Sequence, residues 1–348
     1  MKPAFSALLL SAVAWLSACG GASAPASSAP ASAAAKPSAA ASGVVSLKYG
    51  ISGTGGATTI FRLMNQQNIW AQEGLKAEMT QFQGDPIAFT ALTAGELEFV
   101  AAGADAAVAL AVKGAPIRII GVVQNKFEYH LVAAPDIRSP QDLKGKALAV
   151  SKIGSNSDFA TREVLKRLQV DPNSVTILQV GNSVERMAAI QSGSVKASIM
   201  SPDFVPQLVD KGFHDLADMS KMDIQYPFIT IGASTALLNG KPDLAQRFLR
   251  ATYRGIKEFD ANPVAAQKIL SDQSNETRPE VIQVSWETYR NVFARDLTPN
   301  PAVFADLLTV LGTTDAAMKD AKPEQYIDNR PVQQVNGSGL PQQLFGKS

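Results

Sequence analysis

The chain has 348 residues, of which 46% are hydrophobic and 18% are charged. This length and balance fit a globular protein with room for two lobes of ordinary domain size. Lys and Arg total 32 and Asp and Glu total 31, so removing an N-terminal segment that contains Lys2 leaves a formally neutral chain. A neutral chain without a run of Lys or Arg argues against a nucleic-acid partner, which needs clustered basic surface to displace counterions.

The N-terminus has the pattern of an export signal. Lys2 supplies a positive charge, and Ala4–Leu16 is apolar but too short to span a bilayer. The stretch ends in Leu16-Ser17-Ala18-Cys19, which resembles the lipobox of bacterial lipoproteins. We expect residues 1–18 to be a lipoprotein signal peptide and Cys19 to be lipidated; the alternative is an ordinary secretory signal with an incidental cysteine. Cys19 is the only cysteine of the chain, so no intramolecular disulfide can form.

Residues 19–43 are expected to be a disordered tether. They are nearly all Ala, Ser, Pro and Gly, and this composition cannot bury a core. Such a tether would hold the folded body off the membrane. Signal and tether together predict an exported protein that is lipid-anchored to a bacterial membrane and faces the periplasm or the cell exterior.

Strand-like and helix-like segments alternate after the tether. The strand-like segments are 45–51, 76–82 and 97–102, and the helix-like segments are 60–70 and 86–94. This rhythm predicts an α/β fold with mostly parallel sheets.

The same order returns about 98 residues later. The shift carries residues 78–82 onto 176–180, 89–95 onto 187–193 and Asp105 onto Asp203. Identities are few, so the shared order of elements carries more weight than the matched letters. Two similar α/β lobes are the simplest interpretation, because two copies at this period are too few for a solenoid.

Two apolar runs are expected to cross between the lobes, namely Glu128–Pro135 and Tyr226–Ala233. They divide the folded body into lobe 1, residues 44–128 plus 233–335, and lobe 2, residues 129–232. Lobe 1 would end in helices over 242–260, after Asn262-Pro263, and over 281–293, and residues 336–348 would be a flexible tail. Two crossings make a hinge, and a hinge between two lobes makes a cleft.

Several stretches then resemble one known family, the substrate-binding proteins of ABC importers in the nitrate/sulfonate/taurine and thiamine-pyrimidine group. The stretches are Asn68–Leu75, Leu92–Phe99, Pro140–Lys146, Phe248–Ala251 with Asn262-Pro263, and Tyr326–Arg330. The resemblance covers residues 45 to 335, and it implies a two-lobe type II periplasmic-binding-protein fold that closes around one ligand. It also implies a small-molecule ligand and an ABC permease as partners, and we expect a monomer without cofactors.

The candidate site lies at the carboxyl ends of the strands, where open parallel sheets bind ligands. Ser52-Gly53-Thr54 connects a strand to a helix in lobe 1, and Ser155-Asn156-Ser157 does so in lobe 2. Backbone N–H groups and the helix dipole at such positions favour an anion. The alternative is that both loops only cap their helices.

Further candidates end later strands or flank the crossings. They are Asp85, Gly103, Ala104, Asn125, Asn182, Ser201, Asp203 and Tyr226. Small residues would let a ligand approach the backbone, and Asn side chains both donate and accept hydrogen bonds. Ordinary turn chemistry or core packing is the alternative for each. Lys126, Lys152 and Arg186 lie near these loops, and the sequence does not favour any one of them as a ligand contact.

Enzymatic signatures are weak. The two histidines, His130 and His214, have no partners at zinc-ligand spacing, and no Gly-x-Ser-x-Gly motif is present. The pyrimidine synthases that resemble this family carry a cysteine-rich motif, which this chain lacks. We expect a binding protein without cofactor or metal whose ligand is a sulfonate, carboxylate or similar oxyanion. A pyrimidine or other aromatic heterocycle is the alternative ligand, and a ligand-sensing module or a hydrolase is the alternative role.

Overall fold

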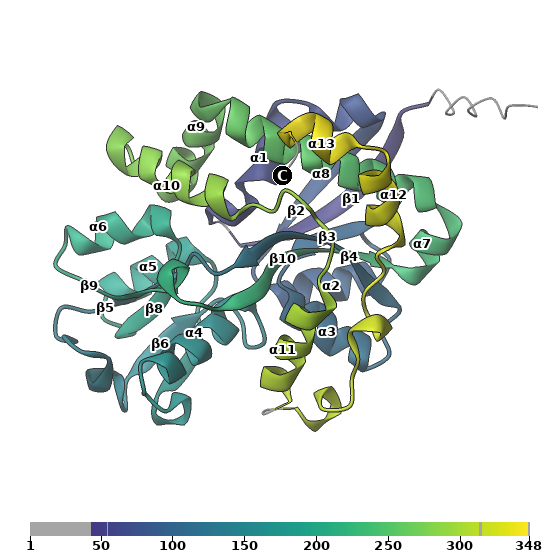
Figure 1. Ribbon diagram of the computed structural model, residues 1–348. Coiled ribbons are helices and arrows are strands. Elements are labelled where there is room, and N and C mark those ends of the chain that lie inside the picture. The colour runs from purple at the N-terminus through teal and green to yellow at the C-terminus, as the bar shows by residue number, and fades with distance from the viewer. Residues whose placement is uncertain (1–42, 54, 313–314, 347–348) are drawn as a thin grey trace, which may run out of the picture. The chain divides into compact units, whose positions relative to one another are not determined.

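The computed structural model describes residues 43–53, 55–312 and 315–346 (Figure 1). The expected signal peptide, Cys19 and nearly all of the expected tether lie outside these residues, as does Thr54. None of the described helices combines the length and the apolar character that a membrane crossing needs.

The first sheet has the strand order β2-β1-β3-β10-β4. Its strands are β1 (Val45–Ser52), β2 (Leu75–Phe82), β3 (Phe99–Ala102), β4 (Ile117–Lys126) and β10 (Gln225–Ser234). β1 is parallel to β2 and β3, whereas β10 is antiparallel to β3 and β4. All four residues of β3 are buried, as expected for a strand inside a sheet that is covered on both faces.

The second sheet has the order β7-β6-β8-β5-β9. Its strands are β5 (His130–Ala133), β6 (Ala147–Val150), β7 (Thr176–Gln179), β8 (Ala197–Met200) and β9 (His214–Asp218). β6 is parallel to β7 and β8, and β5 is antiparallel to β8 and β9. The two sheets therefore have the same topology, which confirms the two-lobe α/β fold.

The sequence repeat corresponds to this shared topology. The matched segments 78–82 and 176–180 fall in the edge strands β2 and β7. The segments 89–95 and 187–193 end the helices α2 (Asp85–Thr93) and α5 (Ser183–Gln191). Asp105 lies in the first turn of α3 (Ala104–Val112), and Asp203 lies in the short 3-10 helix Pro202–Phe204.

The second expected crossing, Tyr226–Ala233, is a strand instead. It forms most of β10, which lies between β3 and β4 in the first sheet. A continuous apolar run has no alternation that would distinguish a linker from a strand buried on both faces. The chain passes between the sheets at 127–129 and at 219–224, so all of β10 belongs with the first sheet rather than with residues 129–232.

Helices cover both sheets (Figure 1). They include α1 (Thr59–Gln66), α4 (Asn156–Arg167), α6 (Val205–Val209), α7 (Thr235–Gly240), α8 (Pro242–Ala261), α9 (Pro263–Ser274), α10 (Pro279–Val292) and α11 (Pro301–Leu311). α8 packs on α1 and presents Phe248 to the first sheet. The Phe248 ring stacks on Phe99 of β3 with centroids 4.2 Å apart and lies 5.1 Å from Trp70.

The C-terminal residues differ from the expected flexible tail. α12 (Arg330–Gly337) extends into this segment and α13 (Leu340–Phe345) lies within it, and both helices pack against α8. The Tyr253 hydroxyl donates to Asn336 Oδ1 at 2.7 Å, and the Arg295 guanidinium lies over the Phe345 ring at 5.0 Å. α13 is too short for a helical period to show in the sequence, and only the Gly339-Leu340-Pro341 start signals it.

Candidate functional site

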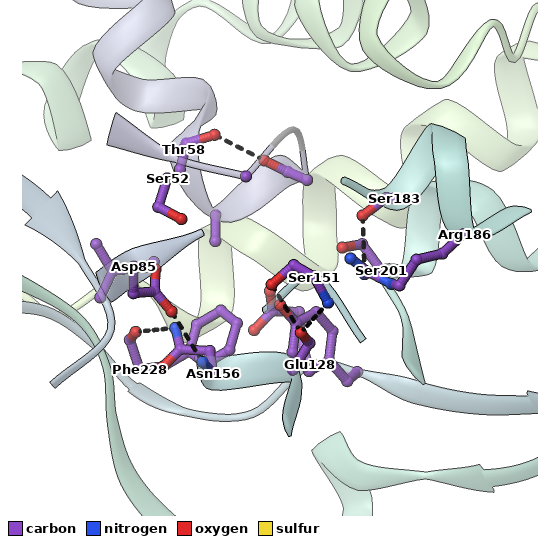
Figure 2. A pocket seen from close by; sticks show the side chains of 16 residues that line it. Ser52, Thr58, Asp85, Glu128, Ser151, Asn156, Ser183, Arg186, Ser201 and Phe228 are labelled. Atoms are coloured by element: carbon purple, nitrogen blue, oxygen red, sulfur yellow. Dashed lines mark hydrogen bonds between the residues drawn. The ribbon is translucent and has the colours of Figure 1, made fainter. Parts of the chain in front are cut away.

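A cavity of about 40 Å³ lies where loops of both sheets meet (Figure 2). From the first sheet's side it is lined by Ser52, Gly53, Gly55, Ala57, Thr58 and Asp85. From the second sheet's side it is lined by Ser151, Asn156, Ser157, Ser183, Arg186 and Ser201, and the first crossing and β10 add Glu128, Tyr129, Phe228 and Ile229. Ser52 ends β1, Ser151 follows β6 and Ser201 follows β8, so the cavity lies at the carboxyl ends of parallel strands in both lobes.

The two strand-to-helix loops expected to face each other do meet at this cavity. Ser52 and Gly53 line it from one side, and Asn156 and Ser157 line it from the other. Asp85 and Ser201, also expected as contacts, belong to the same lining. Gly53 has a φ of 83°, which an L side chain rarely adopts, so a glycine suits this turn.

Three serines of lobe 2 form a closed hydroxyl network beside the cavity. The Ser151 Oγ lies 2.8 Å from Ser155 Oγ and 2.9 Å from Ser157 Oγ, and the last two lie 2.9 Å apart. The backbone N–H of Ser151 donates to Ser157 Oγ at 2.8 Å. A hydroxyl both donates and accepts, so the network can reorient a proton toward a ligand without moving the backbone.

Asp85 joins the two lobes. This buried carboxylate, in the first turn of α2, accepts the backbone N–H of Asn156, the first residue of α4, at 2.8 Å. Burial raises the pKa of Asp85, and hydrogen bonds from Asn156, Ser52 and Gly103 oppose that rise. Its oxygens are therefore committed to the protein, and its role at the cavity is to hold the loops in place.

Asn156 extends this contact to β10. Its Nδ2 donates to the Phe228 carbonyl at 2.6 Å, and its Oδ1 accepts from the Tyr226 hydroxyl at 3.1 Å. A Cβ placed on Gly103 would lie 2.1 Å from Asn156 Oδ1, so only glycine fits where the two lobes approach here. Tyr226 and Gly103 thus support the site without lining the cavity.

Arg186 places a positive charge at the cavity wall. It lies on α5 and is buried, and its NH1 donates to the Gly181 carbonyl at 2.8 Å while its NH2 donates to Ser183 Oγ at 3.2 Å. Its Nε and NH2 also reach the Ile199 carbonyl. Burial lowers the pKa of Arg186, yet a guanidinium stays charged in proteins. No ion pair in the described part of the chain includes Arg186, so an anion in the cavity would balance its charge.

Glu128, in the segment between β4 and β5, adds an ionisable carboxyl to the cavity wall. It is fully buried, and its Oε2 accepts from Gln124 Nε2. Burial raises the pKa of Glu128 to about 8, an effect that nearby Asp203 reinforces. The carboxyl is therefore mostly neutral at neutral pH, and Arg186 retains its charge.

The other expected contacts lie outside the cavity lining. Asn182 caps α5 by accepting from the backbone N–H groups of Val184 and Glu185 at 2.9 and 3.1 Å, which is the helix-capping alternative. Asp203 Oδ1 accepts from the Tyr289 hydroxyl at 2.9 Å. The remaining ones are Ala104, which is buried at the start of α3, Asn125, which is half-buried on β4, and Ser155, which belongs to the serine network.

Sequence reasoning missed part of the lining. Ser151 directly follows β6, and Ser183 is the first residue of α5, next to the candidate Asn182. Including the first residue after each strand and the first residue of each following helix would find both. Glu128 looked like the first residue of an apolar crossing, and no local pattern reveals that a crossing residue turns inward. Tyr129 and Phe228 are further lining residues of this kind.

Metal ligands do not gather at the site. Across the described ranges, no three His, Cys, Asp or Glu side chains lie close enough to hold a metal ion.

A family model described as NMT1/THI5 like matches residues 59–266, which is more than half of the chain. Two curated relatives, from Brucella abortus (strain 2308) and Brucella suis biovar 1 (strain 1330), are named as binding proteins and are 28% identical over 126 residues. That match spans 36% of this chain and 39% of the length of each relative.

Solved structures share the fold over most of the chain. A protein of Bordetella bronchiseptica RB50 aligns with a TM-score of 0.74 and 18% identity, covering 85% of this chain and 98% of that one. The alkanesulfonate-binding protein of Xanthomonas axonopodis pv. citri bound to MOPS gives 0.67 and 18%, covering 85% and 99%. The periplasmic nitrate-binding protein of Synechocystis PCC 6803 gives 0.67 and 10%, covering 85% and 89%. The family model confirms the resemblance seen in the sequence, and the solved structures confirm the two-lobe fold.

Proposed function

Because the chain belongs to the NMT1/THI5-like family, we propose that it is a solute-binding protein that captures a small molecule between its two lobes and delivers it to an ABC importer. The cavity supports this role, since both lobes contribute to its lining and hydrogen bonds such as Asn156 N to Asp85 Oδ2 connect them across it. Capture by two lobes and a hinge is a common mode of ligand closure.

The proposed ligand is a small oxyanion such as a sulfonate or carboxylate. The observation that carries this proposal is the buried Arg186, which forms no ion pair in the described part of the chain, although the charge of Glu185 raises its pKa slightly against the effect of burial. Serine hydroxyls add hydrogen-bond donors at the same wall. The first turns of α4 and α5 add the positive ends of their helix dipoles. The names of two structural relatives, an alkanesulfonate-binding and a nitrate-binding protein, agree with this class.

A thermal-shift screen of the purified protein tests the ligand class. Ethanesulfonate, acetate and nitrate should raise the melting temperature in a concentration-dependent way, because a ligand that binds only the folded state stabilises it. Sodium chloride at matched ionic strength is the control, and uracil represents the alternative class of ligand. A shift with uracil and none with any anion would contradict an oxyanion site.

An aromatic heterocycle is the second candidate ligand. Tyr129 and Phe228 both line the cavity, with ring centroids 5.0 Å apart in an edge-to-face arrangement. Such rings favour flat aromatic ligands. The uracil arm of the same screen tests this candidate.

The proposed role is binding without turnover, and the proposed place is a lipid anchor at Cys19 on the outer side of a bacterial membrane. Cys19 is the only cysteine, so metabolic labelling with an alkyne fatty acid should mark the wild-type chain and not the Cys19→Ser variant. Labelling of both chains would contradict the anchor.

Two further measurements test the role. If mass spectrometry recovers a bound anion unchanged, the protein binds the anion and does not hydrolyse it. If vesicles that contain the permease take up the anion, the role is import and not sensing.

A further inference from the structure

Glu128 presents a buried oxygen that no protein group satisfies. Among the described cavity-lining residues, its Oε1 is the buried side-chain atom without a hydrogen-bond partner. An unsatisfied buried polar atom costs about 1–3 kcal/mol, so such an atom at a cavity wall points to a missing partner. Figure 2 shows Glu128 on the wall opposite Ser52 and Thr58, with Arg186 on a third side.

The hydrogen bonds around Glu128 decide which of its oxygens faces a ligand. Gln124 Nε2 donates both to Glu128 Oε2 and to the Lys126 carbonyl, the latter at 2.7 Å. A carbonyl can only accept, so the Lys126 carbonyl fixes the orientation of the Gln124 amide. Oε2 therefore serves as an acceptor, and the proton of a neutral Glu128 lies on Oε1.

The groups around Glu128 favour its neutral form. Asp203, in the short 3-10 helix after β8, raises the pKa of Glu128, and Asp85 on α2 also lines the cavity. Tyr129 and Tyr289 of α10 stay neutral, because burial raises the pKa of each hydroxyl. Arg186 on α5 is the positive group at the same wall, so a neutral Glu128 leaves the charge of Arg186 to a ligand.

We propose that Glu128 is a ligand-contacting residue that determines specificity: as a neutral acid it donates its Oε1 proton to an oxygen of the anion that Arg186 attracts. This inference rests on the proposed oxyanion site and names the chemistry that the ligand must offer. The ligand presents an ionised oxygen, as in a sulfonate or a carboxylate, at the Glu128 wall.

A pH titration of anion affinity tests this role. The proton that the ligand needs is lost as pH rises through about 8, and ionised Glu128 then repels the anion. The Kd of the full-length protein for ethanesulfonate, measured by calorimetry, should be nearly flat up to about pH 7, roughly double by about pH 8, and then rise about tenfold per pH unit.

The Glu128→Gln variant separates Glu128 from other titrating groups. The amide keeps a donor and stays neutral, so the variant should bind ethanesulfonate within about threefold of wild type near pH 6.5 and should show little rise in Kd up to about pH 10. Glu96→Gln changes an exposed glutamate and should retain the wild-type pH profile. A titration caused by Asp203, whose pKa is about 7, would persist in Glu128→Gln.

Two results would overturn the inference while leaving the oxyanion site intact. One is an ethanesulfonate affinity that is unchanged or stronger at high pH. The other is a Glu128→Gln variant whose Kd rises with pH as steeply as that of wild type. Binding of none of the tested anions at any pH would instead remove the proposed ligand class, and this inference with it.

Discussion

Two buried aspartates, Asp85 and Asp203, connect the lobes, and their hydrogen bonds differ. Asp85 reaches from lobe 1 to the backbone of Asn156 and also accepts from Ser52 and Gly103. Asp203 reaches from lobe 2 to the Tyr289 hydroxyl and the Gly56 N–H, but its Oδ2 has no partner among the described residues. The hydrogen bonds of the Asp85 carboxyl are satisfied. The Asp203 carboxyl has one oxygen without a partner among the described residues, and its pKa of about 7 lets it titrate near neutral pH. We infer that Asp85 holds the geometry of the site and that Asp203 sets how firmly the lobes stay together.

Removing Asp85 should have the largest effect. Asp85→Ala leaves the N–H of Asn156 and the donors from Ser52 and Gly103 without an acceptor, at about 1–3 kcal/mol for each unsatisfied buried group. The free energy of unfolding, measured with urea, should fall by about 3 kcal/mol or more, and anion binding should be lost. Asp272→Ala removes an exposed partner of Lys268 and should change stability by less than about 0.5 kcal/mol. Equal losses in the two variants would contradict the comparison.

Changing Tyr289 should have a smaller effect. Tyr289→Phe keeps the ring that packs on Gly56 but leaves Asp203 Oδ1 without its hydroxyl donor. We expect a loss of about 1–2 kcal/mol at neutral pH and a further rise in the pKa of Asp203. Urea unfolding at pH values on either side of neutrality measures both. A variant as stable as wild type would show that Asp203 does not depend on Tyr289.

The pH dependence of stability distinguishes the aspartates directly. Burial raises the pKa of Asp203 from 3.8 to about 7, so the folded state holds this proton more tightly than the unfolded state. The resulting stabilisation is complete below about pH 4 and is lost as pH rises toward 7. Asp203→Asn cannot titrate, so its free energy of unfolding should change less over this window. A wild-type slope in Asp203→Asn would assign the effect to other carboxyls.

The smallest effect is expected at Asn182. This residue accepts from two backbone N–H groups at the start of α5 and does not line the cavity. Asn182→Ala should cost about 1 kcal/mol of stability, the usual worth of an N-cap, and should leave the anion Kd unchanged. If Asn182→Ala is fully folded but binds the anion with a changed Kd, Asn182 is a ligand contact after all.

Much of the fold could be predicted because its signals are local. Alternating segments and a repeated order of elements indicate two α/β lobes, and the strand-end rule selects Ser52, Asp85, Asn156 and Ser201 for the cavity. Glu128 and Arg186 could not be selected in this way. Arg186 looks like a surface charge on a helix until α5 packs on β8 and buries it, and Glu128 is buried beside Gln124, which donates to its carboxyl. Tertiary contacts thus decide the charge of the site, whereas local patterns decide its position.

The most direct test of the central claim is a calorimetric comparison of wild type with Arg186→Lys and Arg167→Gln, using ethanesulfonate near pH 6.5. A lysine keeps the charge but cannot reproduce the guanidinium's contacts with Gly181, Ser183 and Ile199, so binding should weaken about tenfold or more. Arg167 is half exposed on α4 and pairs with Glu163, and its loss should leave the Kd unchanged. An Arg186→Lys variant that is folded and binds ethanesulfonate as tightly as wild type would contradict an anion site built around Arg186.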